Sequence, residues 1–290
     1  MGNGPCMWIR STARRFLAAD GTSHVRALAY QSAFVMMAGF IGLVGLASVL
    51  DLGQLRTIVQ ELASSVAPGA AGRLLQEAIR QGSGDGPLPA VIGLGAALTS
   101  GTFAMAQLQR SANRLHGIET DDPPARRYGQ ALALAASAGV LLAIGGLMLG
   151  GGRSVATGFD WHGSAATTWE ILRWPLGLSV AGAAIGLMFT VTSPDRRPAH
   201  DLASATGIAL ALWATFTLML GAYLSISSST RNIYGPLLSV VAMLLWAAAT
   251  SLALHLGLAV LADRRGTDAA TPLRRVRLPD SAEIHTSARR

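Results

Sequence analysis

The sequence carries little charge. Charged residues make up 13% of its 290 residues, about half of the share in a typical soluble domain, whereas 51% are hydrophobic. This composition excludes a disordered or collagen-like chain and argues against a soluble enzyme of ordinary design. Lysine is absent, so arginine supplies all 23 basic residues, which outnumber 16 acidic ones. Because the arginines lie between long uncharged stretches, they indicate membrane topology and not a nucleic-acid partner.

Cysteine and the common catalytic patterns are also scarce. Cys6 is the single cysteine, so the chain has no internal disulfide. The sequence contains no Cys/His zinc spacing, no phosphate-binding glycine loop attached to a βαβ unit and no credible Ser-His-Asp set outside the membrane. Asp121, Asp122 and His116 are more simply explained as a turn than as a metal site. We therefore expect no metal, no cofactor and no enzymatic activity.

Six stretches free of Asp, Glu, Lys and Arg are long enough to cross a bilayer, which takes about 20 mostly apolar residues. The first is too long for a signal-peptide core and follows 26 other residues, so it predicts a retained helix. The expected fold is all-α: a polytopic bundle of six transmembrane helices. The stretches cover approximately residues 27–50, 88–108, 131–152, 174–192, 202–225 and 237–262.

Proline positions predict that these helices are unbroken. Each of four prolines lies at the entrance of a stretch or in the turn before it, where a missing N–H costs little. They are Pro89, Pro175, Pro198 and Pro236.

The arginine distribution predicts the orientation. Segments on the side of the termini hold 17 arginines and the opposite segments hold 6, so the positive-inside rule places both termini in the cytoplasm. Trp161, Trp169 and Trp174 then fall at the outer interface. This orientation is the one expected for a multi-pass protein of a bacterial inner membrane.

The segments outside the membrane domain (27–262) have their own patterns. Residues 1–26 form an interfacial segment in which Trp8, Ile9, Phe16 and Leu17 would face lipid, unless it is a disordered leader. Apolar residues at helical spacing in 55–66 and 74–79 predict an amphipathic hairpin in the first outer loop. This hairpin either caps a cavity or only buries its apolar stripe. The tail, residues 263–290, is basic and expected to be disordered.

The predicted spans contain few groups that could do chemistry. His255 is the one titratable side chain, with Ser251 at i−4, and this pair favours a packed hydrogen-bonded contact over a proton relay. Uncharged polar residues could line a cavity, although Ser and Thr can also bond their own helix. Small residues four apart favour close helix packing and are compatible with a homo-oligomer. These pairs are Gly146/Gly150, Gly182/Gly186, Ala38/Gly42 and Gly93/Ala97.

Several short motifs resemble one family. They are the run from Arg26 to Tyr30, Ser100-Gly101, Ser111-Ala112-Asn113, and Tyr234-Gly235 before a Trp246-bearing last span. In this order and spacing, over roughly residues 20–262, the chain resembles the YihY/virulence factor BrkB family, once labelled ribonuclease BN. The resemblance implies a six-helix bacterial inner-membrane protein with a role in the cell envelope. It nominates Tyr30, Asn113, Tyr234 and Gly235 for testing.

Two functions compete. The first is a transporter or translocator of a lipid or another amphiphilic envelope compound, whose charged headgroup would be met by the interfacial Arg26, Arg114 and Arg231. Membrane lipids, anionic ones included, are then the expected partners. The second is a scaffold for envelope integrity, whose basic tail binds anionic lipid or a partner protein. The sequence disfavours a nuclease, because phosphodiester hydrolysis wants metal-binding carboxylates or a histidine pair in a wet groove.

Overall fold

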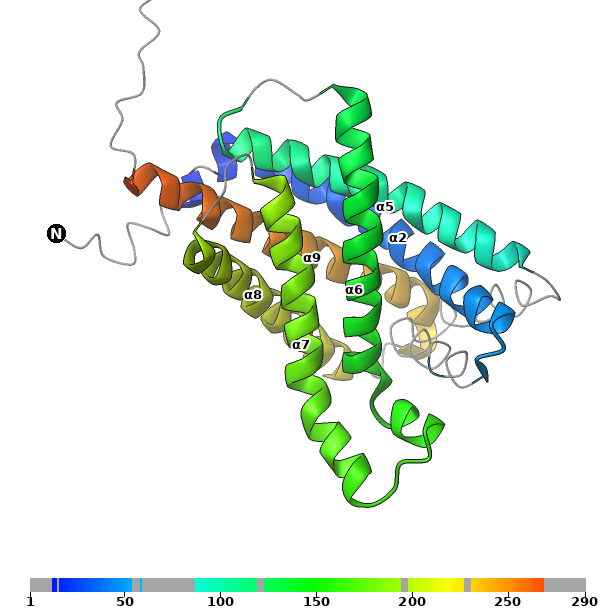
Figure 1. Cartoon of the computed structure of the whole chain (residues 1–290). Helices are drawn as coiled ribbons and strands as arrows, with labels where there is room; N and C mark the ends of the chain where they lie inside the picture. The colour runs from blue at the N-terminus through cyan, green and yellow to red at the C-terminus, as the bar shows by residue number, and fades with distance from the viewer. Residues whose placement is uncertain are drawn as a thin grey trace, which may run out of the picture.

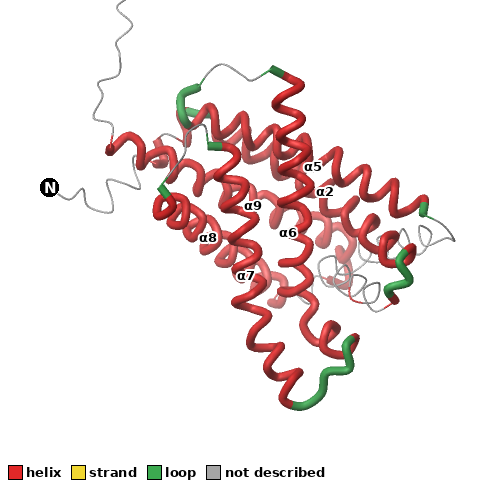
Figure 2. The backbone as a smooth tube through the Cα atoms, viewed as in Figure 1, coloured by secondary structure: helices red, strands yellow, loops and turns green. Residues whose placement is uncertain are grey.

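The protein is a bundle of six long helices. The computed structural model describes residues 12–14, 16–53, 58, 87–118, 123–193, 198–226 and 231–268, and within these it contains no strand (Figures 1 and 2). The all-α prediction is thus confirmed. Apart from Ile58, the predicted outer hairpin lies outside the described residues, as does nearly all of the basic tail. The helices are α2 (Gly21–Val49), α5 (Leu88–Leu115), α6 (Pro124–Gly158), α7 (Ser164–Thr192), α8 (Ala199–Ile226) and α9 (Arg231–Asp268).

All six helices are long and apolar enough to cross a membrane, so the chain is a multi-pass membrane protein. The start of α2 and the end of α9 lie at the same end of the bundle (Figure 1), where Thr12 Oγ1 donates to Asp263 Oδ2 at 3.5 Å. We call this the terminal end and the opposite end the distal end. That the terminal end faces the cytoplasm stays a prediction from the arginine count.

The prediction of unbroken helices with prolines at their entrances is wrong in α6, α7 and α9. Pro236 lies inside α9, which begins at Arg231. Pro175 lies inside α7, because α7 begins at Ser164, ten residues before its apolar stretch. α6 breaks at Gly152, whose φ is 31° and ψ is −118°. α7 supplies donors at this break: Arg173 Nη1 donates to the Leu149 carbonyl at 2.6 Å, and Trp169 Nε1 donates to the Gly152 carbonyl at 2.9 Å. Carbonyls that the break leaves without a helical donor are thereby satisfied within the protein.

Glycines set the closest helix contact. A Cβ on Gly93 of α5 would lie 2.5 Å from the Gly42 Cα of α2, and a Cβ on Gly45 would lie 2.5 Å from the Ala90 backbone nitrogen. Both distances are far below van der Waals contact, so α2 and α5 touch along their backbones, as expected for small residues in membrane helices. A Cβ on Gly146, by contrast, would meet no atom within 4 Å. The spacing of small residues therefore predicted the α2–α5 contact correctly, but Gly146 of α6 does not mark a close helix contact.

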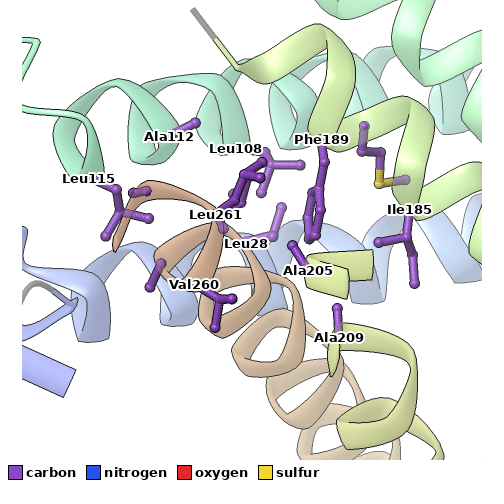
Figure 3. Packing of buried hydrophobic residues seen from close by; sticks show 14 of the residues in the cluster. Leu28, Leu108, Ala112, Leu115, Ile185, Phe189, Ala205, Ala209, Val260 and Leu261 are labelled. Carbon is purple, nitrogen blue, oxygen red and sulfur yellow. The ribbon is translucent and has the colours of Figure 1, made fainter. Parts of the chain in front are cut away.

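The largest hydrophobic core occupies the terminal half of the bundle. Every long helix contributes to it through its terminal portion, for example Leu28 of α2, Leu108 of α5, Phe189 of α7 and Leu261 of α9 (Figure 3). Phe189 packs so closely on α9 that a Cβ at Gly257 would lie 2.7 Å from its ring.

The segment before α2 belongs to this core. Phe16 is buried in it, which corrects the prediction that Phe16 faces lipid. Phe16 can reach the core because Gly21 has no side chain to exclude its ring, which would clash with a Cβ there. Leu17, predicted to face lipid as well, is exposed.

The α6–α7 hairpin diverges from the other helices toward the distal end (Figure 1). Val140 and Leu142 are both exposed although they lie on opposite sides of α6, so only a narrow stripe of this helix is packed. The distal contacts of the hairpin are internal: Trp161 meets Phe159 in a stacked pair and Trp169 in an edge-to-face pair, with ring centroids 5.5 and 5.7 Å apart. Toward the distal end the α6–α7 hairpin is therefore separate from the other helices, whereas α2 and α5 stay in backbone contact there.

Candidate functional site

Buried and half-buried polar side chains lie together at the terminal end, next to the apolar core. We define the polar cluster as His24 of α2, Gln107 and Arg110 of α5, and Ser251 and His255 of α9. Three helices thus meet around groups that are costly to bury in a membrane unless they are paired or used.

The α9 side of the polar cluster is fully enclosed. The His255 side chain is completely buried, and its Nδ1 donates to the Ser251 carbonyl at 2.8 Å, one turn back. Ser251 Oγ donates to the Val25 carbonyl of α2 at 2.9 Å and thereby ties α9 to α2. The packed, hydrogen-bonded histidine expected from the sequence is confirmed.

One atom of His255 is not accounted for by this packing. Its Nε2 is buried and has no hydrogen-bond partner among the described residues. Because Nδ1 carries the hydrogen that it donates to a carbonyl, Nε2 of the neutral ring is an acceptor. A buried acceptor without a donor costs on the order of 1–3 kcal/mol. A hydrogen bond from water or from a ligand during function would remove this cost.

The α2–α5 side of the polar cluster holds a second hydrogen bond. Gln107 Nε2 lies 2.8 Å from His24 Nδ1. The amide nitrogen can only donate, so His24 Nδ1 is the acceptor and the hydrogen of the neutral ring is on Nε2. His24 also lies close enough to His255 to act on it electrostatically. The two halves of the polar cluster are therefore neighbours.

Two arginines extend the polar cluster toward the surface. Gln107, Arg110 and Arg114 are spaced i, i+3 and i+7, so they lie on one side of α5. Arg110 is half-buried, and its Nε is buried without a hydrogen-bond partner in the described part of the chain. Arg114 is exposed. Both lie within electrostatic range of His24, as does Asp20 in the turn before α2.

The sequence-predicted candidates divide between this site and the rest of the surface. Arg114 and His255 each lie within electrostatic range of His24. Tyr30 is 63% exposed and its ring meets Phe34 edge to face, so it lies on the outer surface of the bundle. Arg26 is also exposed, on the other side of α2 from His24.

Asn113 is half-buried, and its carbonyl accepts from Ile118 N–H at 2.9 Å in the turn that ends α5. Gly117 makes this turn with a φ of 74°. Tyr234, Gly235 and Arg231 begin α9 near the distal end, and their side chains lie outside the described part. Tyr234 precedes Ser251 by about 25 Å along the helix axis. These positions therefore do not join the polar cluster.

Several hydroxyls in the helices are satisfied by their own helix. Thr99, Thr102 and Thr215 each donate to the carbonyl four residues earlier, as expected, at 2.7–2.8 Å. Thr206 and Thr250 differ, because their Oγ1 atoms are buried and have no partner in the described residues. The polar groups that remain for a ligand are thus few and lie in the interior.

Sequence reasoning missed His24, Gln107 and Arg110. A signal was present, since polar residues at i, i+3 and i+7 continue α5 beyond its apolar stretch. It could not identify the partner helix. Among the described residues, no group of three His, Cys, Asp or Glu side chains could hold a metal ion. The site offers hydrogen-bond donors, an imidazole acceptor and arginine charge, which suits recognition of a polar group entering from the interface.

Six helices that are long and apolar enough to cross a membrane define a polytopic membrane protein. The family model of virulence factor BrkB matches residues 12–276, so the chain belongs to this family. Comparisons with curated proteins and with solved structures found no match. The family resemblance noted from short motifs is thereby confirmed.

Proposed function

We propose that this protein translocates a lipid or another amphiphilic compound of the cell envelope across a bacterial inner membrane, without enzymatic chemistry. The observation that carries the proposal is the polar cluster, in which His255 Nε2 and Arg110 Nε are buried and have no hydrogen-bond partner among the described residues. A protein whose helices only had to pack would gain stability from apolar residues at these positions.

The shape of the bundle supports the same proposal. The helices share one core at the terminal end, whereas the α6–α7 hairpin diverges at the distal end (Figure 1). An amphiphile moving between leaflets needs a polar route for its headgroup and an apolar surface for its chains. The polar cluster at the terminal end offers a place for the headgroup, and the exposed apolar side chains of the α6–α7 hairpin offer a surface for the chains.

The experiment measures lipid movement in proteoliposomes. The full-length protein should accelerate the exchange of a headgroup-labelled phosphatidylglycerol between leaflets, compared with an unrelated six-helix protein at the same density. We expect His255→Leu to slow this exchange about tenfold, because the buried imidazole acceptor is lost. The matched control is Thr99→Val, which removes an exposed hydroxyl bonded only to its own helix.

The competing hypothesis is a scaffold. Wild-type protein that leaves lipid exchange at the level of the unrelated protein, and a cellular phenotype that disappears on deleting residues 266–290, would support scaffolding and refute translocation. Equal effects of His255→Leu and Thr99→Val would instead remove the polar cluster from the mechanism.

A further inference from the structure

We propose that the α5 face formed by Gln107, Arg110 and Arg114, together with His24 of α2, is a binding site for a phosphate-bearing anionic headgroup. The inference rests on the proposed translocation for its lipid ligand and narrows that ligand to one chemical class. It assigns recognition to Arg110 and Arg114, whereas the sequence-based hypothesis named Arg26, Arg114 and Arg231.

The described residues do not neutralise the charge at this site with an ion pair. Neither Arg110 nor Arg114 forms an ion pair within the described residues, in contrast to Arg173, which is paired with Glu170. Among the described residues, Asp20 is the one acid within electrostatic range of His24, and its Oδ1 already accepts the Ser23 hydroxyl at 3.0 Å. Two arginines and one carboxylate act on His24 from this part of the structure, and their net positive charge favours an anion.

The donors are also of the right kind. Arginine guanidinium groups present parallel N–H donors that match phosphate oxygens. Arg110 Nε is buried, and no described residue forms a hydrogen bond with it. The hydrogen bond from Gln107 fixes His24 in the tautomer that keeps a hydrogen on Nε2, which makes this imidazole another donor. The site thus combines a directional donor set with net positive charge.

The depth of the site fits a lipid phosphate. Arg110 and Arg114 lie two and six residues beyond Leu108, where the apolar stretch ends, which corresponds to about 3 and 9 Å along the helix. The headgroup layer on each side of the hydrocarbon is roughly 5–8 Å thick. The two arginines therefore span the level of the phosphates, and both lie within electrostatic range of His24.

Native mass spectrometry of the full-length protein in a neutral detergent tests this site, with phosphatidylglycerol, phosphatidylcholine and inorganic phosphate as probes. We expect phosphatidylglycerol to bind about tenfold more tightly than phosphatidylcholine, and Arg110→Gln to abolish this preference. Arg114→Gln, an exposed position that folding should tolerate, should weaken it several-fold. The matched control is Arg26→Gln, which removes the same charge at similar depth on an exposed face of α2 and should leave the preference intact.

Each outcome is decisive. Displacement of phosphatidylglycerol by inorganic phosphate, in the wild type but not in Arg110→Gln, identifies the phosphate group itself as the ligand; displacement only by the intact lipid identifies the lipid. Equal affinity for the two lipids, or equal losses in Arg26→Gln and Arg110→Gln, overturns the site. Translocation without Arg110-dependent binding refutes this inference alone, whereas Arg110-dependent binding without translocation refutes the proposed function alone.

Discussion

Polar side chains in this bundle differ in whether their own helix satisfies them. Thr99 and Thr215 use the preceding turn and need no tertiary partner, while Ser251 reaches Val25 and Gln107 reaches His24 on another helix. Only the hydrogen bonds between different helices fix the position of one helix relative to another. Hydrogen bonds between membrane helices contribute about 0.6 kcal/mol on average and up to about 1.7 kcal/mol.

A double-mutant cycle tests the α2–α5 hydrogen bond. We expect His24→Ala and Gln107→Ala each to lower the free energy of unfolding, and their coupling energy to be about 1 kcal/mol, because the two side chains bond each other at 2.8 Å. Detergent-induced unfolding in mixed micelles measures it. The same cycle on His24 and Thr99, whose hydroxyl bonds its own helix, should give a coupling near zero. A coupling near zero for His24 and Gln107 would contradict the bond.

Part of the site could be predicted from sequence because part of it is local. Ser251 and His255 are one turn apart on one helix, so their contact follows from helical periodicity alone. Gln107 and His24 are separated by 83 positions, and their contact depends on which helices are neighbours and in which register. Periodicity carries no information on that pairing, so His24, Gln107 and Arg110 were found only in the structure.

At the scale of elements, small residues decide how closely two helices approach. Gly42 and Gly93 face each other across the α2–α5 contact, whereas Gly95, two residues from Gly93, meets open space. Glycine lowers the stability of a helix because it is a poor helix former. At a helix contact the close packing that glycine allows offsets this loss, whereas on an open face nothing offsets it.

This difference predicts opposite outcomes for two similar substitutions. Gly93→Ala should destabilise the protein by about 1–3 kcal/mol, because the new Cβ would overlap the α2 backbone, which cannot move without separating the helices. Gly95→Ala should be neutral or slightly stabilising. Thermal unfolding of both variants in the same detergent measures the contrast. Equal melting temperatures would show that α2 and α5 are not in backbone contact.

The existence of the helices could be predicted, but their ends and breaks could not. Apolar composition marks the hydrocarbon-crossing part of each helix, and each helix continues beyond it. α7 starts ten residues early, with Trp169, Glu170 and Arg173 in its first turns, so a proline read as a helix entrance lies inside a helix. The α6 break at Gly152 is stabilised by side chains of α7, which no reading of α6 alone could reveal.

At the scale of the whole molecule, the contacts between helices are unevenly distributed. The principal core joins all six helices at the terminal end, and the α6–α7 hairpin separates toward the distal end. Motion that changes access to the interior is therefore expected in the distal part of the α6–α7 hairpin, relative to α2 and α5, which stay in contact there.

Spin-label distance measurements test this asymmetry. After Cys6→Ser, labels at Leu50 and Phe159 report on the distal end, and labels at Ala125 and Ala199, both exposed, report on the terminal end. We expect a broad distal distance distribution that shifts when phosphatidylglycerol is added, and a narrow terminal distribution that does not. Distributions of equal width at both ends would contradict a fixed terminal core.

The hydrogen bond between Thr12 and Asp263 joins residues 251 positions apart. A chain that enters the membrane as it is synthesised inserts α2 first and α9 last. The hydrogen bonds of Val25 with Ser251 and of Thr12 with Asp263 can then form only after the last helix has been inserted. Assembly of the terminal end is thus the last event of biogenesis, and a chain truncated before α9 would leave the polar groups of α2 open to the quality-control proteases of the membrane.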